Sequence, residues 1–492
     1  MTICNIKCRF GAKSSILHSI LALSSLVIIF VFALLSDSQP VYALPIHTAN
    51  VRAIPAFARK YGLPCSACHT AWPELNNFGQ TFRDNGYQLN NDHDSPIYQD
   101  PSYFPITMRI TPNWHRESTN NQTLDNATAA NGLGLVTTHG FDLSGMDLWA
   151  TGTLVKNVSF SLLPSSDINT KFHFENAFVR FDNLLKSRWL NLKVGKFELD
   201  NMISEKRFLF LSANGGLYQS YHFVPVGDTN TFGLGNNALG IELAGHSVNS
   251  YTRYGVAVLS GNDGVTSLGA GTNGSTTTGG GRSYDVYTTF SQAFQVGKLG
   301  LQRFGGYFYG GQRPTIALTT GGAAIPGASY GNKSFYRAGF SAQLNFDRLE
   351  VLPFYMHGYD SAYLGTGTAA NMPLPTGAMA PTWNSGFVEA HLHLNPQFSF
   401  EERTEFIRMS RQALTTNLSN LGNIDAYSVG YRWYPLMFSR GGLAFHNEYS
   451  ITKTQGAYPQ SGTGVGAALA ATPSPTTAVW SNSVLAGFDL AF

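Results

Sequence analysis

The feature that most constrains the fold is a two-residue alternation of apolar and polar side chains, which recurs from about residue 105 to the C-terminus. In residues 336–346, aromatic and aliphatic side chains occupy every second position, with Arg337, Ser341 and Asn345 between them. Successive side chains of a β-strand point to opposite faces, so this period predicts strands with one apolar and one polar face. Similar runs at 388–394, 427–433 and 484–492 extend the prediction over most of the chain.

The composition favours a membrane environment for this sheet. Charged residues make up 13 % of the 492 residues, whereas an average soluble protein contains about 25 %. The mean hydropathy is close to zero, which argues against a helical membrane protein. Strands with one face toward lipid and one toward water satisfy both observations. A soluble β-sandwich or propeller would also produce the alternation.

The number and spacing of the strands favour a closed barrel. Sixteen strands are predicted to begin near residues 105, 141, 157, 171, 189, 238, 251, 283, 299, 335, 348, 384, 398, 425, 442 and 480. The connections after odd-numbered strands are mostly long, at 118–140, 200–237, 260–282, 314–332, 360–381 and 454–477, and those after even-numbered strands are short. Long loops on one rim and short turns on the other are typical of outer-membrane barrels, and a soluble sheet does not account for them.

We therefore predict an all-β transmembrane barrel of about 16 antiparallel strands over residues 105–492. An open sheet is excluded in lipid, because each unpaired backbone N–H or C=O there costs several kcal/mol. The parity of the loops places the N-terminus on the short-turn side. The pattern changes phase near Glu175 and is interrupted at Pro353, where we expect bulges or bends.

Residues 1–43 are predicted to be a signal peptide. A basic start with Lys7, Arg9 and Lys13 precedes an apolar run at 16–35 and a small-residue cleavage site at 41–43. The apolar run exceeds the usual ~7–15 residues, so an uncleaved anchor is the alternative. Removal of this segment brings the formal net charge of +2 to zero, and nothing in the charge balance indicates binding to nucleic acid.

The sequence Cys65-Ser66-Ala67-Cys68-His69 contains every cysteine that follows the predicted cleavage site. The order Cys-x-x-Cys-His is typical of covalent attachment of haem c, with the two thiols on the haem vinyl groups and the histidine as proximal ligand of the iron. A disulfide between these cysteines would close too small a loop to stabilise much. A zinc site would need about four ligands, and the exported chain has no other cysteine. We therefore predict one haem c held by Cys65, Cys68 and His69.

The sequence does not identify the sixth ligand of the haem iron. Met108, His93 and His115 are the candidates. A short amphipathic helix is predicted after the motif, with Phe78 and Phe82 on its apolar face. That face could pack on the porphyrin or on the barrel wall.

Charged and histidine side chains also gather on the polar faces of the predicted strands near the C-terminus. They are Glu389, His391, His393, Glu401, Arg403, Glu405, Arg432, His446 and Glu448. They could form a metal path or a solute constriction, or simply be the polar lining of a barrel lumen.

The front of the chain resembles the fused monohaem cytochrome c–porin family of the outer membrane, whose best-known members are iron(II) oxidases. The matching residues are Pro55, Phe57-Ala58-Arg59, Cys65, Cys68-His69, Pro73, Leu75-Asn76, Gly79, Phe82 and Gly86-Tyr87. In that family the cytochrome segment is thought to plug or line the barrel, and one haem carries electrons from an external donor to a periplasmic carrier. Residue by residue, only haem attachment at Cys65 and Cys68 and ligation at His69 carry over.

The resemblance implies a monohaem cytochrome segment at 44–104, on the periplasmic side or inside the barrel. It implies electron transfer from an extracellular donor, foremost iron(II), to a carrier such as a soluble cytochrome, and hence an iron(II):cytochrome c oxidoreductase in the lipid of the outer membrane. One alternative is a solute channel whose haem-bearing segment is a plug or redox gate. Another is a conduit with a different donor or the reverse direction.

Overall fold

The computed structural model describes residues 56–90, 94, 106–123, 133–166, 173–205, 210, 216–225, 230, 233–260, 284–315, 331–361, 379–395, 397–411, 422–437, 442–455 and 478–491. The predicted signal peptide at 1–43 and the candidate ligand His93 lie outside these residues. The described part begins with a small helical region, here called the plug segment (residues 56–90), which contains α2 (Ala56–Tyr61), α3 (Cys65–Cys68) and α4 (Asn77–Asp84).

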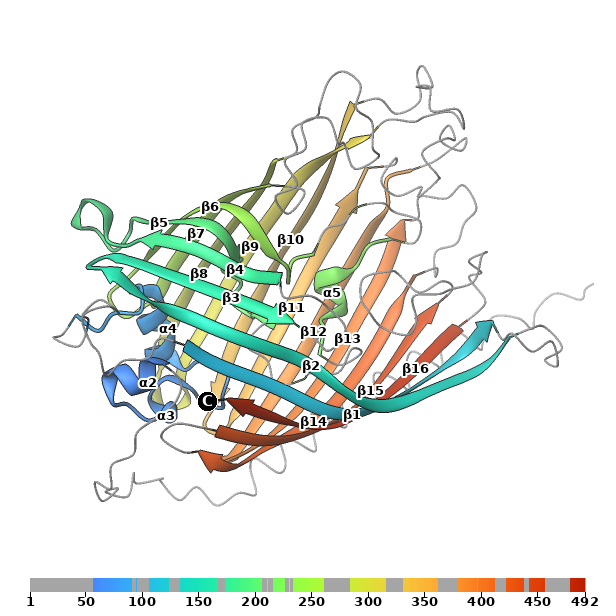
Figure 1. Ribbon diagram of the computed structural model, residues 1–492. Coiled ribbons are helices and arrows are strands. Elements are labelled where there is room, and N and C mark those ends of the chain that lie inside the picture. The colour runs from blue at the N-terminus through green and yellow to red at the C-terminus, as the bar shows by residue number, and fades with distance from the viewer. Residues whose placement is uncertain are drawn as a thin grey trace, which may run out of the picture.

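Sixteen strands in the described residues form one closed antiparallel barrel (Figure 1). Each strand pairs with its neighbours in sequence, and the first and last strands pair to close the sheet, with Arg116 opposite Val484. The strands are β1 (Ile106–Thr123), β2 (Leu133–Val155), β3 (Val158–Ser166), β4 (His173–Phe181), β5 (Asn191–Glu198), β6 (Asn237–His246), β7 (Thr252–Ser260), β8 (Tyr284–Val296), β9 (Gly300–Thr315), β10 (Gly331–Phe346), β11 (Leu349–Asp360), β12 (Thr382–Asn395), β13 (Phe398–Arg411), β14 (Ile424–Met437), β15 (Gly442–Gln455) and β16 (Ala478–Ala491). The predicted barrel is confirmed.

The plug segment lies at the short-turn end of the barrel, as the loop parity predicts (Figure 1). Asn77 donates from its side-chain amide to the carbonyl of Asn249 in the β6–β7 turn. The predicted connection at 118–140 is too long, because β1 continues to Thr123 and β2 already begins at Leu133. Backbone pairing such as Ser118 with Thr137 extends both strands beyond the point where the apolar alternation fades.

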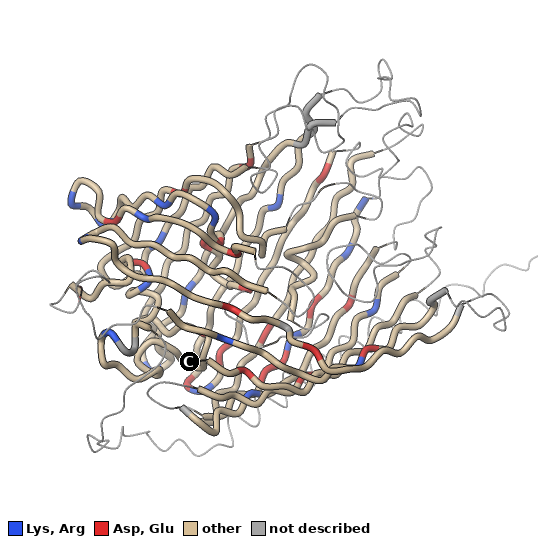
Figure 2. Tube along the Cα trace, viewed as in Figure 1, with Lys and Arg blue, Asp and Glu red and all other residues tan. Residues whose placement is uncertain are grey.

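The two faces of the strands differ as the alternation predicts. On β14, Tyr431 and Trp433 are exposed on the outside of the barrel, whereas Arg432 is completely buried on the inside. Charged side chains inside the barrel are paired across strands, as with Lys193 and Glu242 at 3.0 Å. Figure 2 shows acidic and basic positions next to one another on neighbouring strands of the wall. No helix among the described residues is long and apolar enough to cross a membrane.

The described residues of the connection between β5 and β6, here called the inward segment (residues 199–205, 210, 216–225, 230 and 233–236), lie in the lumen. Its helix α5 (Gln219–His222) packs against β12 and β13 (Figure 1). The ring of Tyr218 stacks on Phe387 at 4.1 Å between ring centroids, and the Tyr221 ring meets Phe354 edge-on at 5.0 Å. A hydrophobic core therefore lies inside the barrel, between the inward segment and the wall.

This core explains where the alternation is least clear. On β11 the inward-facing residues Leu352, Phe354 and Met356 are apolar and buried, because the inward segment covers them. The polar inner face that the alternation predicts is therefore interrupted here. The register is unbroken at Pro353, whereas a bulge lies at Glu175, where Leu163 pairs with Asn176 and Pro164 with Phe174.

Glu405 on β13 holds the start of α5, since its carboxylate accepts from the backbone N–H groups of Gln219 and Ser220 at 3.0 and 2.6 Å. Glu405→Ala leaves these buried donors without that acceptor, at a cost of about 1–3 kcal/mol for each. We expect the inward segment to detach more often and the conductance in a planar lipid bilayer to rise. Ser399→Ala, on the same strand and face, should leave the conductance unchanged. Equal conductance of Glu405→Ala and wild type would contradict this role.

Candidate functional site

The structure brings the three residues of the haem motif together in one helical turn. Cys65 and Cys68 are the first and last residues of α3, and no disulfide joins them. The backbone N–H of His69 donates to the carbonyl of Cys65 at 3.0 Å, after which the chain leaves the helix. Residues three apart in a helix lie on the same face, so both sulfur atoms can meet one edge of a planar ligand.

The ring of His69 is held by backbone carbonyl groups. Its Nδ1 lies 3.2 Å from the carbonyl oxygen of Pro73 and 3.0 Å from that of Glu74. A carbonyl oxygen only accepts hydrogen bonds, so in the neutral ring Nδ1 carries the proton and Nε2 carries the lone pair. A histidine that binds a metal is commonly oriented in this way. The residues present therefore fit a haem iron ligated through Nε2 of His69.

The thiol of Cys68 has the opposite character to a reactive cysteine. Burial, and next the neighbouring Cys65, raise the pKa of the Cys68 thiol to about 11. The thiol of Cys68 is therefore protonated at neutral pH.

Helix α4 packs directly on the haem motif. Its N-cap residue Asn76 accepts from the backbone N–H of Gly79 and donates from its own backbone N–H to the carbonyl of Cys68, both at 3.0 Å. A Cβ atom at Gly79 would lie 2.1 Å from that same carbonyl oxygen, so only glycine allows this approach. The predicted helix is confirmed. Phe82 is buried against Phe57, whereas Phe78 is 44 % exposed.

The candidates for the sixth ligand lie on different faces of β1. Thr107 and Arg109 face the lumen, so Met108 between them points to the outer face. His115 lies on the inner face with its Nδ1 3.9 Å from Oδ2 of Asp142. The identity of the sixth ligand stays a prediction.

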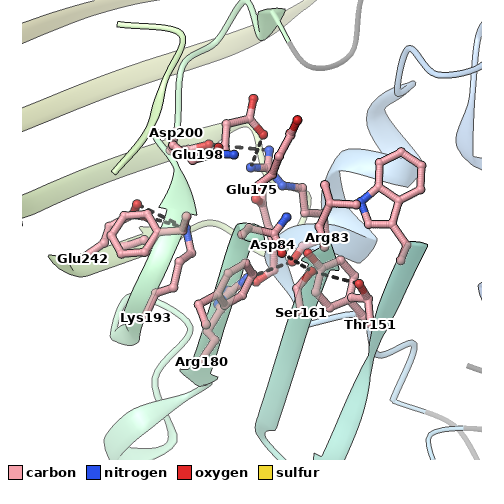
Figure 3. Close-up of a pocket in the computed structure, with 18 of the residues that line it drawn as sticks. Arg83, Asp84, Thr151, Ser161, Glu175, Arg180, Lys193, Glu198, Asp200 and Glu242 are labelled. Atoms are coloured by element: carbon pink, nitrogen blue, oxygen red, sulfur yellow. Dashed lines mark hydrogen bonds and ion pairs between the residues drawn. The ribbon is translucent and has the colours of Figure 1, made fainter. Parts of the chain in front are cut away.

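Buried ion pairs tie the plug segment to the wall (Figure 3). Nε of Arg253, on β7, lies 2.8 Å from Oδ2 of Asp84, and Nη2 lies 2.7 Å from Oδ1 of Asp200. Burial pushes the pKa of both carboxyl groups upward, but the Arg253 guanidinium outweighs it and holds both pKa values below the ordinary 3.8. Nη2 of Arg83 lies 3.7 Å from Oε2 of Glu198.

A cavity of about 450 Å³ separates the plug segment from the wall formed by β1 to β6 (Figure 3). Its lining carries both signs of charge, including Arg109 and Lys193 beside Glu175 and Glu242. A space of this size and polarity can hold a small hydrophilic solute.

The histidines of the C-terminal strands meet carboxylates that the sequence analysis did not place there. His391 and His393 on β12 lie beside Glu350 on β11 and Glu74 of the plug segment. Glu350 stands opposite His391 in the sheet register, and β11 and β12 are joined by a long connection, so the sequence contains no turn that would set this register.

Comparisons with known proteins assign the chain to no family. No protein-family model and no curated protein matches the chain. Among solved structures, an anion-selective porin from Comamonas acidovorans shares 12 % identity at a TM-score of 0.49, covering 79 % of this chain and 99 % of the porin. The outer membrane channel DcaP of Acinetobacter baumannii shares 10 % identity at 0.44, covering 78 % and 97 %. OprB of Pseudomonas putida shares 10 % identity at 0.41, covering 78 % and 94 %. At these identities and TM-scores the three likenesses carry no argument about this chain.

The docking of the plug segment should survive mild acid. A carboxyl group whose pKa is lowered in the folded state stabilises that state, and the stabilisation is complete at pH values above the ordinary pKa of 3.8. It is lost as the pH falls below 3.8 toward the lowered pKa. We therefore expect Asp84 and Asp200 to keep the plug segment resistant to pepsin at pH 4, with faster cleavage only at lower pH.

The pepsin rates are normalised at each pH to those of an unfolded substrate. Arg253→Gln lacks the cation that holds both carboxylates and should already be cleaved rapidly at pH 4. A wild-type plug segment that is released at pH 5 would contradict the assignment.

Proposed function

We propose that the chain spans a bacterial outer membrane and transfers electrons through one haem c, which it binds at the short-turn mouth of the barrel. The observation that carries the proposal is the Cys65–Cys68 turn followed by His69, whose ring is held with its lone pair on Nε2.

The chain's own residues would each have a distinct part. The sulfur atoms of Cys65 and Cys68 would hold the haem, and Nε2 of His69 would bind its iron. When bound, a c-type haem supplies one reversible one-electron couple. The carbonyl of Glu74 orients the His69 ring, and Gly79 lets α4 support the turn from behind.

The barrel would hold the chain in the outer membrane. Large apolar side chains such as Phe340 and Trp433 are exposed on its outer face, which suits contact with lipid. In outer-membrane barrels short turns face the periplasm, so the plug segment would meet a periplasmic carrier such as a soluble cytochrome. We infer from the resemblance of residues 55–87 that the extracellular donor is iron(II), which would make the protein an iron(II):cytochrome c oxidoreductase. Oxidation outside the cell would keep insoluble ferric product out of the periplasm.

A solute channel is the second candidate. It is favoured by the barrel fold itself and by the cavity of about 450 Å³ with Arg109, Lys193, Glu175 and Glu242 in its lining. In this case the plug segment would obstruct or gate the pore rather than carry electrons.

The electron-transfer proposal is tested by mixing the oxidised, purified protein with iron(II) and following haem absorbance. We expect reduction of the haem in the wild type. Cys68→Ser should lose covalent haem staining while the barrel still folds, as judged by its heat-modifiable mobility in detergent gels. Covalent haem retained at wild-type level in Cys68→Ser would overturn the attachment site. Absence of haem reduction across a range of pH would overturn iron(II) as the donor.

The channel candidate predicts that the wild-type protein conducts solute in a planar bilayer. The electron-transfer proposal predicts instead a pore that is closed in both redox states, because the plug segment and the inward segment both lie against the inner wall. Steady conductance of the wild type, equal in the oxidised and reduced protein, would instead favour a channel in which the haem has no gating role.

A further inference from the structure

The strongest unassigned feature is a group of four potential metal ligands at the boundary between the plug segment and the wall. Glu74 comes from the plug segment, Glu350 from β11, and His391 and His393 from β12. One ligand atom from each residue lies within 4.8 Å of all the others. Donor atoms that share one ion at bond lengths of about 2.0–2.2 Å lie at most ~4.4 Å apart, so small side-chain rotations would close the set.

The cluster is buried, and some of its polar atoms have no hydrogen-bond partner among the described residues. Glu350 is 4 % exposed and His391 is fully buried. Oε1 of Glu74 and Nε2 of His393 have no hydrogen-bond partner in the described part of the chain, and Oε2 of Glu350 has only the 3.4 Å contact with Nδ1 of His391. Leaving one buried polar atom unpaired costs about 1–3 kcal/mol, so two such atoms in one place point to a missing occupant.

The arrangement around His391 resembles the support of a metal ligand. Its Nδ1 faces the cluster, at 3.0 Å from Oε2 of Glu74 and 3.4 Å from Oε2 of Glu350. Its Nε2 lies 2.7 Å from Oε1 of Glu389, whose other oxygen lies 3.4 Å from Arg403. Metal-binding histidines commonly donate their second nitrogen to such a carboxylate, which fixes the tautomer.

The ligand Glu350 is also held in place by a neighbouring side chain. Gln343 donates to Oε1 of Glu350, which leaves Oε2 directed to the cluster. Two imidazoles and two carboxylates suit a divalent first-row transition metal, whereas Mg²⁺ and Ca²⁺ prefer oxygen ligands alone. An ion pair network around a protonated His391 is the alternative. It accounts for His391 and Oε2 of Glu350, and it leaves Oε1 of Glu74 and Nε2 of His393 without a hydrogen bond among the described residues.

We propose that Glu74, Glu350, His391 and His393 bind one divalent first-row transition-metal ion of the Fe²⁺, Mn²⁺ and Zn²⁺ class, which joins the plug segment to the barrel wall. The site is distinct from the haem iron, because it uses the side chain of Glu74 while His69 uses its backbone carbonyl. It does not depend on the direction of electron transfer or on the donor.

The test uses the full-length protein in detergent, stripped with EDTA and then incubated with Zn²⁺ or Mn²⁺. We expect one zinc to be retained per chain after dialysis, measured by plasma mass spectrometry, and the spectrum of free Mn²⁺ to be lost on binding in electron paramagnetic resonance. Millimolar Mg²⁺ should not displace either ion. Absence of stoichiometric retention, or displacement by Mg²⁺, would overturn the proposal.

Variants locate the ion. Glu74→Gln and His393→Gln should each lose retained zinc, and Glu389→Gln should weaken binding about 10–100-fold, as expected for a residue that orients a ligand. His446→Gln is the matched control, since His446 is also buried inside the barrel and, among the described residues, has Glu448 as its one ion-pair partner, at 2.8 Å. Equal zinc retention in wild type, Glu74→Gln and His393→Gln would overturn the site.

Two features of the experiment keep its result interpretable. Glu74 lies outside the barrel strands, so Glu74→Gln tests the site even where a substitution on β12 prevents folding. The same titration in Cys68→Ser, which lacks covalent haem, should still retain one zinc. The metal site and the haem proposal therefore fail independently of each other.

Discussion

The pairing of β1 with β16 is the interaction on which the rest of the structure depends. A sheet in hydrocarbon has no water to satisfy its edges, so the first and last strands must meet. Closure turns one face of every strand outward and encloses the other. The enclosed space of a sixteen-stranded barrel is wider than its wall side chains fill, and in this chain two further segments lie against the inner wall.

These two segments are held there by different means. The inward segment brings apolar side chains such as Tyr218 and Tyr221 against an apolar patch of the wall, and it is held mainly by aromatic packing. The plug segment is held mainly by polar contacts, among them Arg253 to Asp84 and the hydroxyl of Tyr434 to the carbonyl of Trp72. The lumen therefore has an apolar cluster under the inward segment and a charged cavity beside the plug segment.

The sequence was informative where a pattern is local and uninformative where it depends on distant pairing. The alternation in 427–433 correctly placed Tyr431 outside and Arg432 inside, because strand geometry links neighbouring positions directly. The Cys-x-x-Cys-His turn and its following helix were likewise readable from spacing. Glu350 and Glu74 were missed, because their meeting with His391 requires both the register of β11 on β12 and the docking of the plug segment. The apolar inner face of β11 blurred the alternation for a similar reason, since its cover comes from residues more than a hundred positions away.

The contacts of the plug segment fall into two sets with different sequence separation. Asn76 to Cys68, Gly79 to Cys68 and Phe82 to Phe57 join residues close in sequence, whereas Asp84 to Arg253 and Glu74 to His391 span 169 and 317 positions. Local contacts form before distant ones, because they close short loops. The motif can thus take its shape while the strands that will surround it are still unassembled. Covalent modification of Cys65 and Cys68 would then act on an open, preshaped turn, and closure of the barrel would come afterwards as the step that seals it in place.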